Sequence, residues 1–85
     1  MKRITFEAEA FEQYNEWASS DKKSFNKFLK LIYETVNTPF IGTGKPEPLR
    51  YDLQGFWSRH ITDEHRLVYK VTDEEIIIIS CKYHY

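Results

Sequence analysis

Three side chains in the second half of the sequence could together cleave RNA. Glu47 is a carboxylate, Arg66 is a permanent cation, and His84 is an imidazole beside the last residue of the chain. Attack of an RNA 2′-hydroxyl on its own phosphate needs a base to take the proton, an acid to protonate the departing 5′-oxygen, and a cation beside the crowded phosphate. Glu47, His84 and Arg66 supply one group for each role, and no step requires a metal ion.

Each of these residues also has an ordinary structural explanation. Glu47 stands between two prolines, which should keep its carboxylate out of helix or strand pairing, yet most glutamates are simply solvated. Arg66 could be a surface cation on a strand, and chain ends are commonly disordered, although the flanking tyrosines could anchor His84. Only the combination predicts a site, in which Tyr85 could stack on a nucleotide or hydrogen-bond to it.

Other catalytic motifs are incomplete in this sequence. The run Gly42–Lys45 resembles a phosphate-binding loop, but Pro46 follows where a serine or threonine is needed. The three histidines lack the spacing of zinc ligands, Cys81 lies in an apolar run, and no serine has the glycines of a nucleophile turn around it. We therefore expect no cofactor, no metal and no covalent intermediate.

The bulk composition indicates one small globular domain covering residues 1–85. A single cysteine and an N-terminus without an apolar secretory run favour the reducing cytoplasm, and the longest aliphatic run, Ile76 to Ile79, is too short to cross a membrane. The net charge of −1, from 12 Lys and Arg against 13 Asp and Glu, argues slightly against a broad RNA-binding face. All three histidines lie after residue 59, so cationic chemistry belongs to that part of the chain.

The start of the chain predicts a short strand and then a helix. Residues 2–6 alternate polar and apolar side chains, which favours a strand. Between residues 7 and 19, apolar side chains recur at helical spacing, while the acidic residues and Gln13 are expected to face elsewhere. The expected inward positions of this helix are Phe11, Tyr14 and Ala18, with Trp17 beside them.

A second helix is indicated more strongly. Ser20 or Asp21 can cap its start, and Pro39 should end it near Asn37, because proline disfavours the helical conformation of the residue before it. Its apolar face comprises Phe25, Phe28, Leu29, Ile32 and Val36, and its solvated face comprises Lys22, Lys23, Lys27 and Lys30, to which we assign no site role. The irregular segment 37–48 that follows is long enough to suggest a functional reason.

The second half of the chain predicts a series of strands separated by turn residues, at 49–53, 56–61, 66–72 and 75–83. Two helices are too few to cross over every strand, so an α+β fold with an antiparallel sheet is favoured over a doubly wound parallel one. In such a meander Arg66 pairs near Ile61 and near Cys81. The C-terminal end of the chain is therefore expected at the sheet edge that carries Arg66.

The segment GTGKPEPLRYDLQGFWSRHITDEHRLVY and the terminal CKYHY resemble the Txe/YoeB toxins of the RelE-like superfamily, and the similarity covers nearly the whole chain. The resemblance implies a RelE-like fold with two N-terminal helices packed on an antiparallel sheet. It also implies the toxin of a type II toxin–antitoxin pair that cuts messenger RNA in the ribosomal A site. The implied products are a 2′,3′-cyclic phosphate and a 5′-hydroxyl, and the implied effect is inhibition of translation.

By this resemblance the general base falls on Glu47, the phosphate-binding arginine on Arg66, the general acid on His84 and the terminal aromatic on Tyr85. Three further motif positions are expected to assist RNA binding through charge or orientation, namely Lys45, Arg59 and His65. One departure is His60, where relatives often have a second arginine, so the resemblance gives it no role. The implied partners are messenger RNA on the 70S ribosome, a Phd/YefM-type antitoxin that folds over the toxin, and often a second toxin copy.

Two other functions are compatible with such a fold. A same-fold toxin that acts by binding, such as a gyrase-poisoning relative, would not need Glu47, His84 and Tyr85 together. An inactive module could serve only as a partner of its antitoxin and a co-repressor of their operon. RNA cleavage separates both alternatives from the nuclease.

Overall fold

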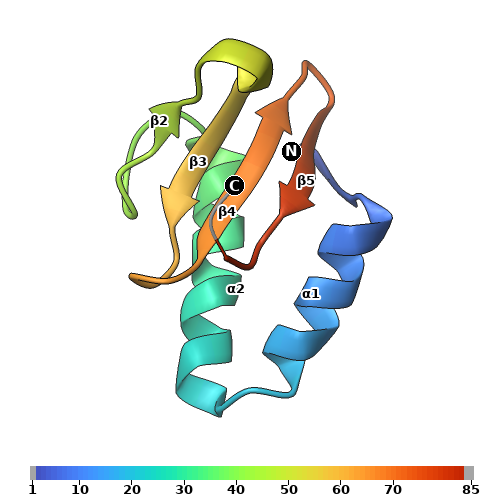
Figure 1. The fold of residues 1–85 in the computed structure, drawn as a ribbon, viewed down its shortest axis with the longest axis vertical. Coiled ribbons are helices and arrows are strands. Elements are labelled where there is room, and N and C mark those ends of the chain that lie inside the picture. Colours follow the sequence, from blue (N-terminus) through green and yellow to red (C-terminus); the bar gives the residue numbers. More distant parts are fainter. Residues whose placement is uncertain (1, 84–85) are drawn as a thin grey trace.

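The computed structural model describes residues 2–83, in which two helices pack on one face of a five-stranded sheet (Figure 1). Figure 1 shows α2 passing behind β3 and β4. The helices are α1 (Ala8–Ala18) and α2 (Lys22–Asn37). The strands are β1 (Arg3–Phe6), β2 (Glu47–Pro48), β3 (Phe56–His60), β4 (Arg66–Val71) and β5 (Glu75–Ser80), and a single 3-10 turn covers Tyr51–Leu53. The predicted α+β fold with two N-terminal helices is confirmed.

The sheet is mixed, with the strand order β1-β5-β4-β3-β2. The predicted antiparallel meander is confirmed for β2 to β5, but β1 pairs with β5 in parallel, with Arg3 opposite Glu75 and Phe6 opposite Ile78. No tight turn joins β1 to β5, because both helices and the other strands separate them along the chain, so hairpin geometry does not force an antiparallel direction. Sequence alternation alone could not have revealed this edge.

The predicted strand at 49–53 is wrong. Pairing with β3 covers Glu47 and Pro48 and continues through one bond from Leu49 N to the carbonyl of Phe56, at 2.9 Å, before the chain turns. Tyr51 then adopts a φ of 58°, which a continuing strand cannot contain. The expectation that prolines would keep Glu47 out of pairing is also wrong, because β2 is an edge strand, where a missing proline N–H costs no ladder bond.

Helix α1 is rotated relative to the predicted face. Ala10 and Trp17 are buried, whereas Phe11 is 54% exposed and Ala18 is exposed. The Trp17 indole Nε1 donates to the carbonyl of Cys81 at 2.8 Å, so burying this large side chain also satisfies its polar group. Gln13, expected to face elsewhere, accepts from the backbone N of Cys81 at 2.7 Å. The chain after β5 is therefore tied to α1.

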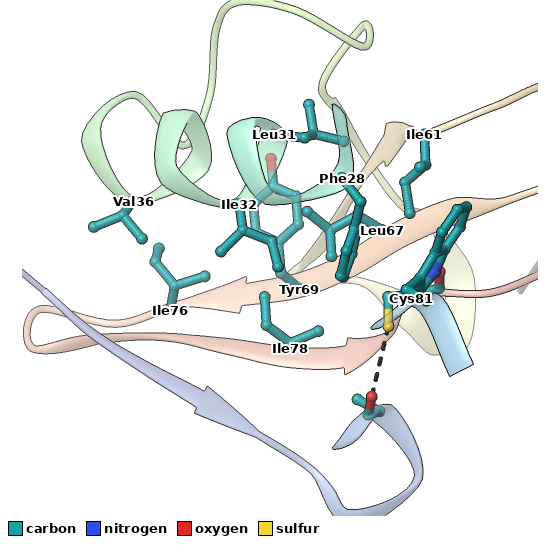
Figure 2. Close-up of a cluster of buried hydrophobic side chains, with 12 residues drawn as sticks. Phe28, Leu31, Ile32, Val36, Ile61, Leu67, Tyr69, Ile76, Ile78 and Cys81 are labelled. Atoms are coloured by element: carbon teal, nitrogen blue, oxygen red, sulfur yellow. Dashed lines mark hydrogen bonds between the residues drawn. The ribbon is translucent and has the colours of Figure 1, made fainter. Parts of the chain in front are cut away.

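Helix α2 begins as predicted at Asp21, whose carboxylate accepts from Ser24 N at 2.8 Å, and it ends at Asn37. Figure 2 shows its apolar side chains packed against those of β4 and β5. The buried core consists of Ala10, Trp17, Phe28, Leu31, Ile32, Val36, Ile61, Leu67, Tyr69, Ile76, Ile78 and Cys81. Within residues 2–83, neither helix is long and apolar enough to cross a membrane.

Candidate active site

The outer face of the sheet, defined as the face turned away from the helices, carries Glu47 and Arg66. Leu67 of β4 belongs to the helix-side core, so its neighbours Arg66 and Val68 point to the outer face, because side chains alternate along a strand. Glu47 of β2 lies opposite Ser58 of β3, and Ser58 lies opposite Val68 of β4. This register places Glu47 on the same face as Arg66.

The separation of Glu47 and Arg66 follows from the register. Adjacent strands lie about 4.8 Å apart and successive residues about 3.4 Å apart, so the two backbone positions are separated by roughly 10 Å across the sheet and about 7 Å along it. Glu47 is exposed and Arg66 is half-buried. Both side chains are long, so a phosphodiester lying between them is within their combined reach.

The guanidinium of Arg66 is held by the loop that precedes β4. Its Nη1 donates to the carbonyls of Thr62 at 2.8 Å, Asp63 at 3.0 Å and His65 at 3.1 Å. Within residues 2–83, its Nε and Nη2 make no hydrogen bond, and arginine can grip a phosphate with two donors at once. Arg66 is thus positioned by carbonyls while it retains donors for an anion.

The last described residue, Tyr83, lies beside Arg66. The backbone N of Arg66 donates to the carbonyl of Tyr83 at 3.2 Å. Arg66 pairs with His60, one position from the expected Ile61, because the loop before it contains one residue more than predicted. The predicted acid His84 and the aromatic Tyr85 lie outside the described residues.

Arg59 does not offer its charge to RNA in this structure. It is fully buried on the helix side of the sheet, and each of its five N–H donors has an acceptor. The acceptors are Glu34 Oε2 (2.8 Å), the carbonyls of Thr38, Ile41 (2.8 Å) and Thr43 (3.3 Å), and the Tyr69 hydroxyl (3.3 Å). Arg59 therefore acts through orientation: it holds the loop between α2 and β2.

The loop held by Arg59 leads directly to Glu47. Glu34 of α2 accepts from the backbone N of Thr43 at 2.9 Å as well as from Arg59. The carbonyl of Gly44 accepts from the backbone N of His60 at 2.7 Å, and a Cβ at Gly44 would come within 2.8 Å of the carbonyl of His60. Lys45 follows, exposed and with a φ of 52°. The sequence analysis missed Glu34 as a support, since an acid near the end of a lysine-rich helix has no distinctive spacing.

His65 is a packed residue with little free surface. Its side chain is 14% exposed, and its ring meets the Trp17 ring edge-on at 5.3 Å between centroids. Its Nδ1 accepts from the backbone N of Tyr83 at 2.8 Å. The structure thus gives His65 a contact with Tyr83, the last described residue. From the sequence, His65 was expected to assist RNA binding through charge or orientation.

The Cys81 thiol and the Tyr69 hydroxyl are both buried in the core. Burial raises the pKa of the Cys81 thiol to about 12, so this thiol stays protonated and is a poor nucleophile. Burial also raises the pKa of Tyr69, whose hydroxyl is bonded to Arg59 and to the carbonyl of Pro39. Residues 2–83 contain no group of three His, Cys, Asp or Glu side chains arranged to hold a metal ion.

Residues 6–85 match the family model described as the YoeB-like toxin of bacterial type II toxin-antitoxin systems. The chain belongs to this family. Toxin YoeB of Streptomyces coelicolor is 51% identical over 83 residues, 98% of this chain and 99% of the relative. The YoeB dimer structure from Staphylococcus aureus has a TM-score of 0.89 at 46% identity, covering 99% of this chain and 98% of that one. The YoeB–YefM complex structure from the same organism has a TM-score of 0.88 at 44% identity, covering 100% and 99%.

This YoeB-like toxin also has a cationic groove that the sequence analysis did not assign. The groove encloses about 830 Å³ between α2 and the start of the loop held by Arg59. Its lining is Lys22, Lys23, Asn26, Lys27, Lys30, Leu31, Glu34, Thr43 and His60. The single acid in this lining, Glu34, is paired with Arg59, so the lysines give the groove its charge. Helical spacing predicted the lysine face of α2. That His60 of β3 lines the same groove could be seen only in the folded structure.

Proposed function

We propose that this YoeB-like toxin is a ribosome-dependent endoribonuclease that cleaves messenger RNA in the A site and thereby inhibits translation. The observation that carries the proposal is the shared outer face of Glu47 and Arg66, with the backbone of Tyr83 bonded to Arg66. A carboxylate and a guanidinium are thus presented together, and the chain reaches Arg66 one residue before His84. The carboxylate and the guanidinium are two of the groups that metal-independent cleavage needs, and we assign the third, the acid, to His84.

In the proposed reaction, Glu47 accepts the proton of the 2′-hydroxyl as its oxygen attacks the neighbouring phosphorus. Arg66 stabilises the charge that grows on the phosphate oxygens. The bond from phosphorus to the 5′-oxygen breaks, and His84 donates a proton to that oxygen. The products are a 2′,3′-cyclic phosphate and a 5′-hydroxyl, and Tyr85 stacks on or hydrogen-bonds to a nucleotide beside the cut.

A dependence on the ribosome agrees with the charge of the chain. The net charge is −1, which gives little general attraction for free RNA, because affinity for nucleic acid rises with the number of phosphates neutralised. A ribosome that holds the message in a fixed geometry supplies the orientation that a small enzyme lacks. Lys45, exposed two residues before β2, is proposed to add positive charge beside the substrate.

The proposed protein partner is an antitoxin of the YefM type, and a second proposed partner is another copy of the toxin. The support comes from the two Staphylococcus aureus structures, which are a YoeB–YefM complex and a YoeB dimer. This chain aligns with both over nearly its full length at 44% and 46% identity.

The test is to map transcript 5′ ends in a translating extract for Glu47→Gln and His84→Gln, which are nearly isosteric. We expect codon-phased breaks with the wild-type protein and their loss in both variants, with antitoxin binding retained. Glu12→Gln, at an exposed acid on α1, is the matched control and should cleave normally. Full cleavage by both active-site variants would refute the nuclease mechanism, and absence of cleavage by the wild type would favour a toxin that acts by binding.

A further inference from the structure

The ring of His65 is enclosed by a side chain of α1 and by the last described residue, Tyr83. It meets the Trp17 indole of α1 edge-on at 5.3 Å and 77°, and the Tyr83 ring at 5.1 Å and 61°, measured between centroids and planes. Only 14% of its side chain is exposed. The ring therefore has one orientation in which its two nitrogens meet defined partners.

The hydrogen bond to Tyr83 fixes the tautomer of His65. Nδ1 accepts from the backbone N–H of Tyr83 at 2.8 Å, which it can do only while it carries no proton. The ring proton of the neutral imidazole must then sit on Nε2, which faces a carboxylate oxygen of Glu64 at 3.2 Å. A neutral histidine can carry its ring proton on either nitrogen, and these two contacts place it on Nε2.

The same contact holds an unusual piece of backbone. Tyr83 has a φ of 61°, in the left-handed region that bulky residues rarely adopt, so its conformation needs external support. Its N–H is bonded to His65 and its carbonyl is bonded to the N–H of Arg66. Just before it, Cys81 is tied to α1 by Gln13 and Trp17. His65 thus supplies the contact to the N–H of the last described residue.

We infer that His65 is a positioning residue, whose neutral Nε2–H form holds the backbone of Tyr83 in place beside Arg66. The anchoring of Tyr83 stands on the geometry alone. The consequence for cleavage rests on the proposed function, in which His84 is the acid.

This role makes the anchoring of Tyr83 sensitive to protonation of His65. A proton on Nδ1 would turn the acceptor into a donor that faces the Tyr83 N–H, and the bond would be lost. Charged groups lie on several sides of the ring. Glu64 faces Nε2, and Arg66 donates a hydrogen bond to the backbone carbonyl of His65. Beside Trp17, the Lys82 Nζ pairs with the Glu16 carboxylate at 3.9 Å.

Two variants separate the acceptor from the bulk of the ring. His65→Asn places an amide oxygen near the position of Nδ1, so it keeps an acceptor but cannot titrate. His65→Leu fills the space beside Trp17 without an acceptor. His60→Asn is the control for a histidine that lies outside this contact.

The readouts are the ring ¹⁵N shifts of His65, the amide resonance of Tyr83 at a single pH of 8, and cleavage kinetics. We expect the Nε2–H tautomer in the wild type and in His60→Asn, with the same Tyr83 amide shift in both. In His65→Asn the Tyr83 amide should keep a hydrogen-bonded shift close to that of the wild type, and cleavage should stay near wild type. In His65→Leu, kcat should fall roughly tenfold to a hundredfold with KM little changed, because the acid is misplaced.

An Nδ1–H tautomer in the wild type, or a Tyr83 amide in His65→Leu that matches the wild type, would overturn the inference whatever the variants do in cleavage. An altered Tyr83 amide with unchanged kcat would instead overturn the positioning role in cleavage and count against His84 as the acid. If His65→Leu does not fold, the tautomer of the wild type and the Tyr83 amide shift of His65→Asn still decide.

Discussion

Arg59 and Glu47 lie on opposite faces of the same sheet, and their environments explain why one supports and the other can react. Arg59 is enclosed, and a buried guanidinium is tolerable only when its donors are satisfied, as all of them are here. Glu47 is exposed at an edge strand, where its carboxylate can meet a substrate. The motif positions that resemble the family therefore combine an exposed group that a substrate can reach with a buried group that holds the loop in place.

Ser58, opposite Glu47, is the one buried side-chain polar group in residues 2–83 without a hydrogen-bond partner. An unpaired buried hydroxyl costs stability, so removing it should not destabilise the fold. We expect Ser58→Ala to raise the free energy of unfolding by about 1 kcal/mol, measured by urea denaturation. Ser80→Ala is the control, since the Ser80 hydroxyl bonds to Gln13 and to the carbonyl of Lys82, and it should lose about 1 kcal/mol. A loss in Ser58→Ala equal to that of the control would show that the hydroxyl is satisfied in solution.

For single residues, the sequence predicts the chemical group that a position offers better than it predicts the burial and the contacts of that group. Glu47 and Arg66 were chosen for their residue types, and the fold puts them on one face. The burial of Arg59 and the contact of His65 with Tyr83 depend on partners 10 to 25 positions away along the chain, which no local pattern encodes.

The start of α2 is the element that local chemistry specifies most fully. The backbone and side-chain hydrogen bonds from Ser24 hold the pKa of Asp21 below its ordinary value. Because the folded pKa is lowered, the charged cap stabilises the fold above the ordinary carboxyl pKa of about 4, and this contribution is lost as the pH falls through the folded value. We expect Asp21→Ala to melt at a lower temperature than wild type at pH 7, with a smaller difference at pH 2.5.

Thermal melts at the two pH values measure this, and Asp52→Ala is the control for an exposed acid that caps no α-helix. A difference between Asp21→Ala and wild type that is the same at pH 7 and pH 2.5 would mean that the charge of the cap contributes nothing.

Elements whose ends are set by local signals were predictable, and elements set by distant pairing were not. Asp21 and Pro39 bracket α2 in the sequence, and α2 spans Lys22–Asn37. By contrast, β2 consists of only two residues, and its position is fixed by pairing with β3 rather than by alternation. The face of α1 depended on whether Phe11 or Trp17 is buried, and the bond from Trp17 to Cys81 decides it in a way that spacing cannot show.

The molecule as a whole concentrates positive charge on one groove although its net charge is only −1. Four of its 12 basic residues line the groove beside α2, and the acid there is paired with Arg59. The loop that forms part of the groove continues to Lys45 and Glu47.

If the groove contacts ribosomal RNA, Lys27→Gln combined with Lys30→Gln should weaken binding to 70S ribosomes in a salt-dependent manner. Each lysine that touches a phosphate contributes about one unit to the slope of log Kd against log salt, so the double variant should lose about two units. The matched control combines Lys2→Gln with Arg3→Gln, which removes the same charge at the edge strand β1, away from the groove and from Glu47 and Arg66. An equal loss of slope in both double variants would show that only the total charge of the protein matters. If the groove itself binds RNA, removing the two α2 lysines must reduce the slope more than removing two cations elsewhere.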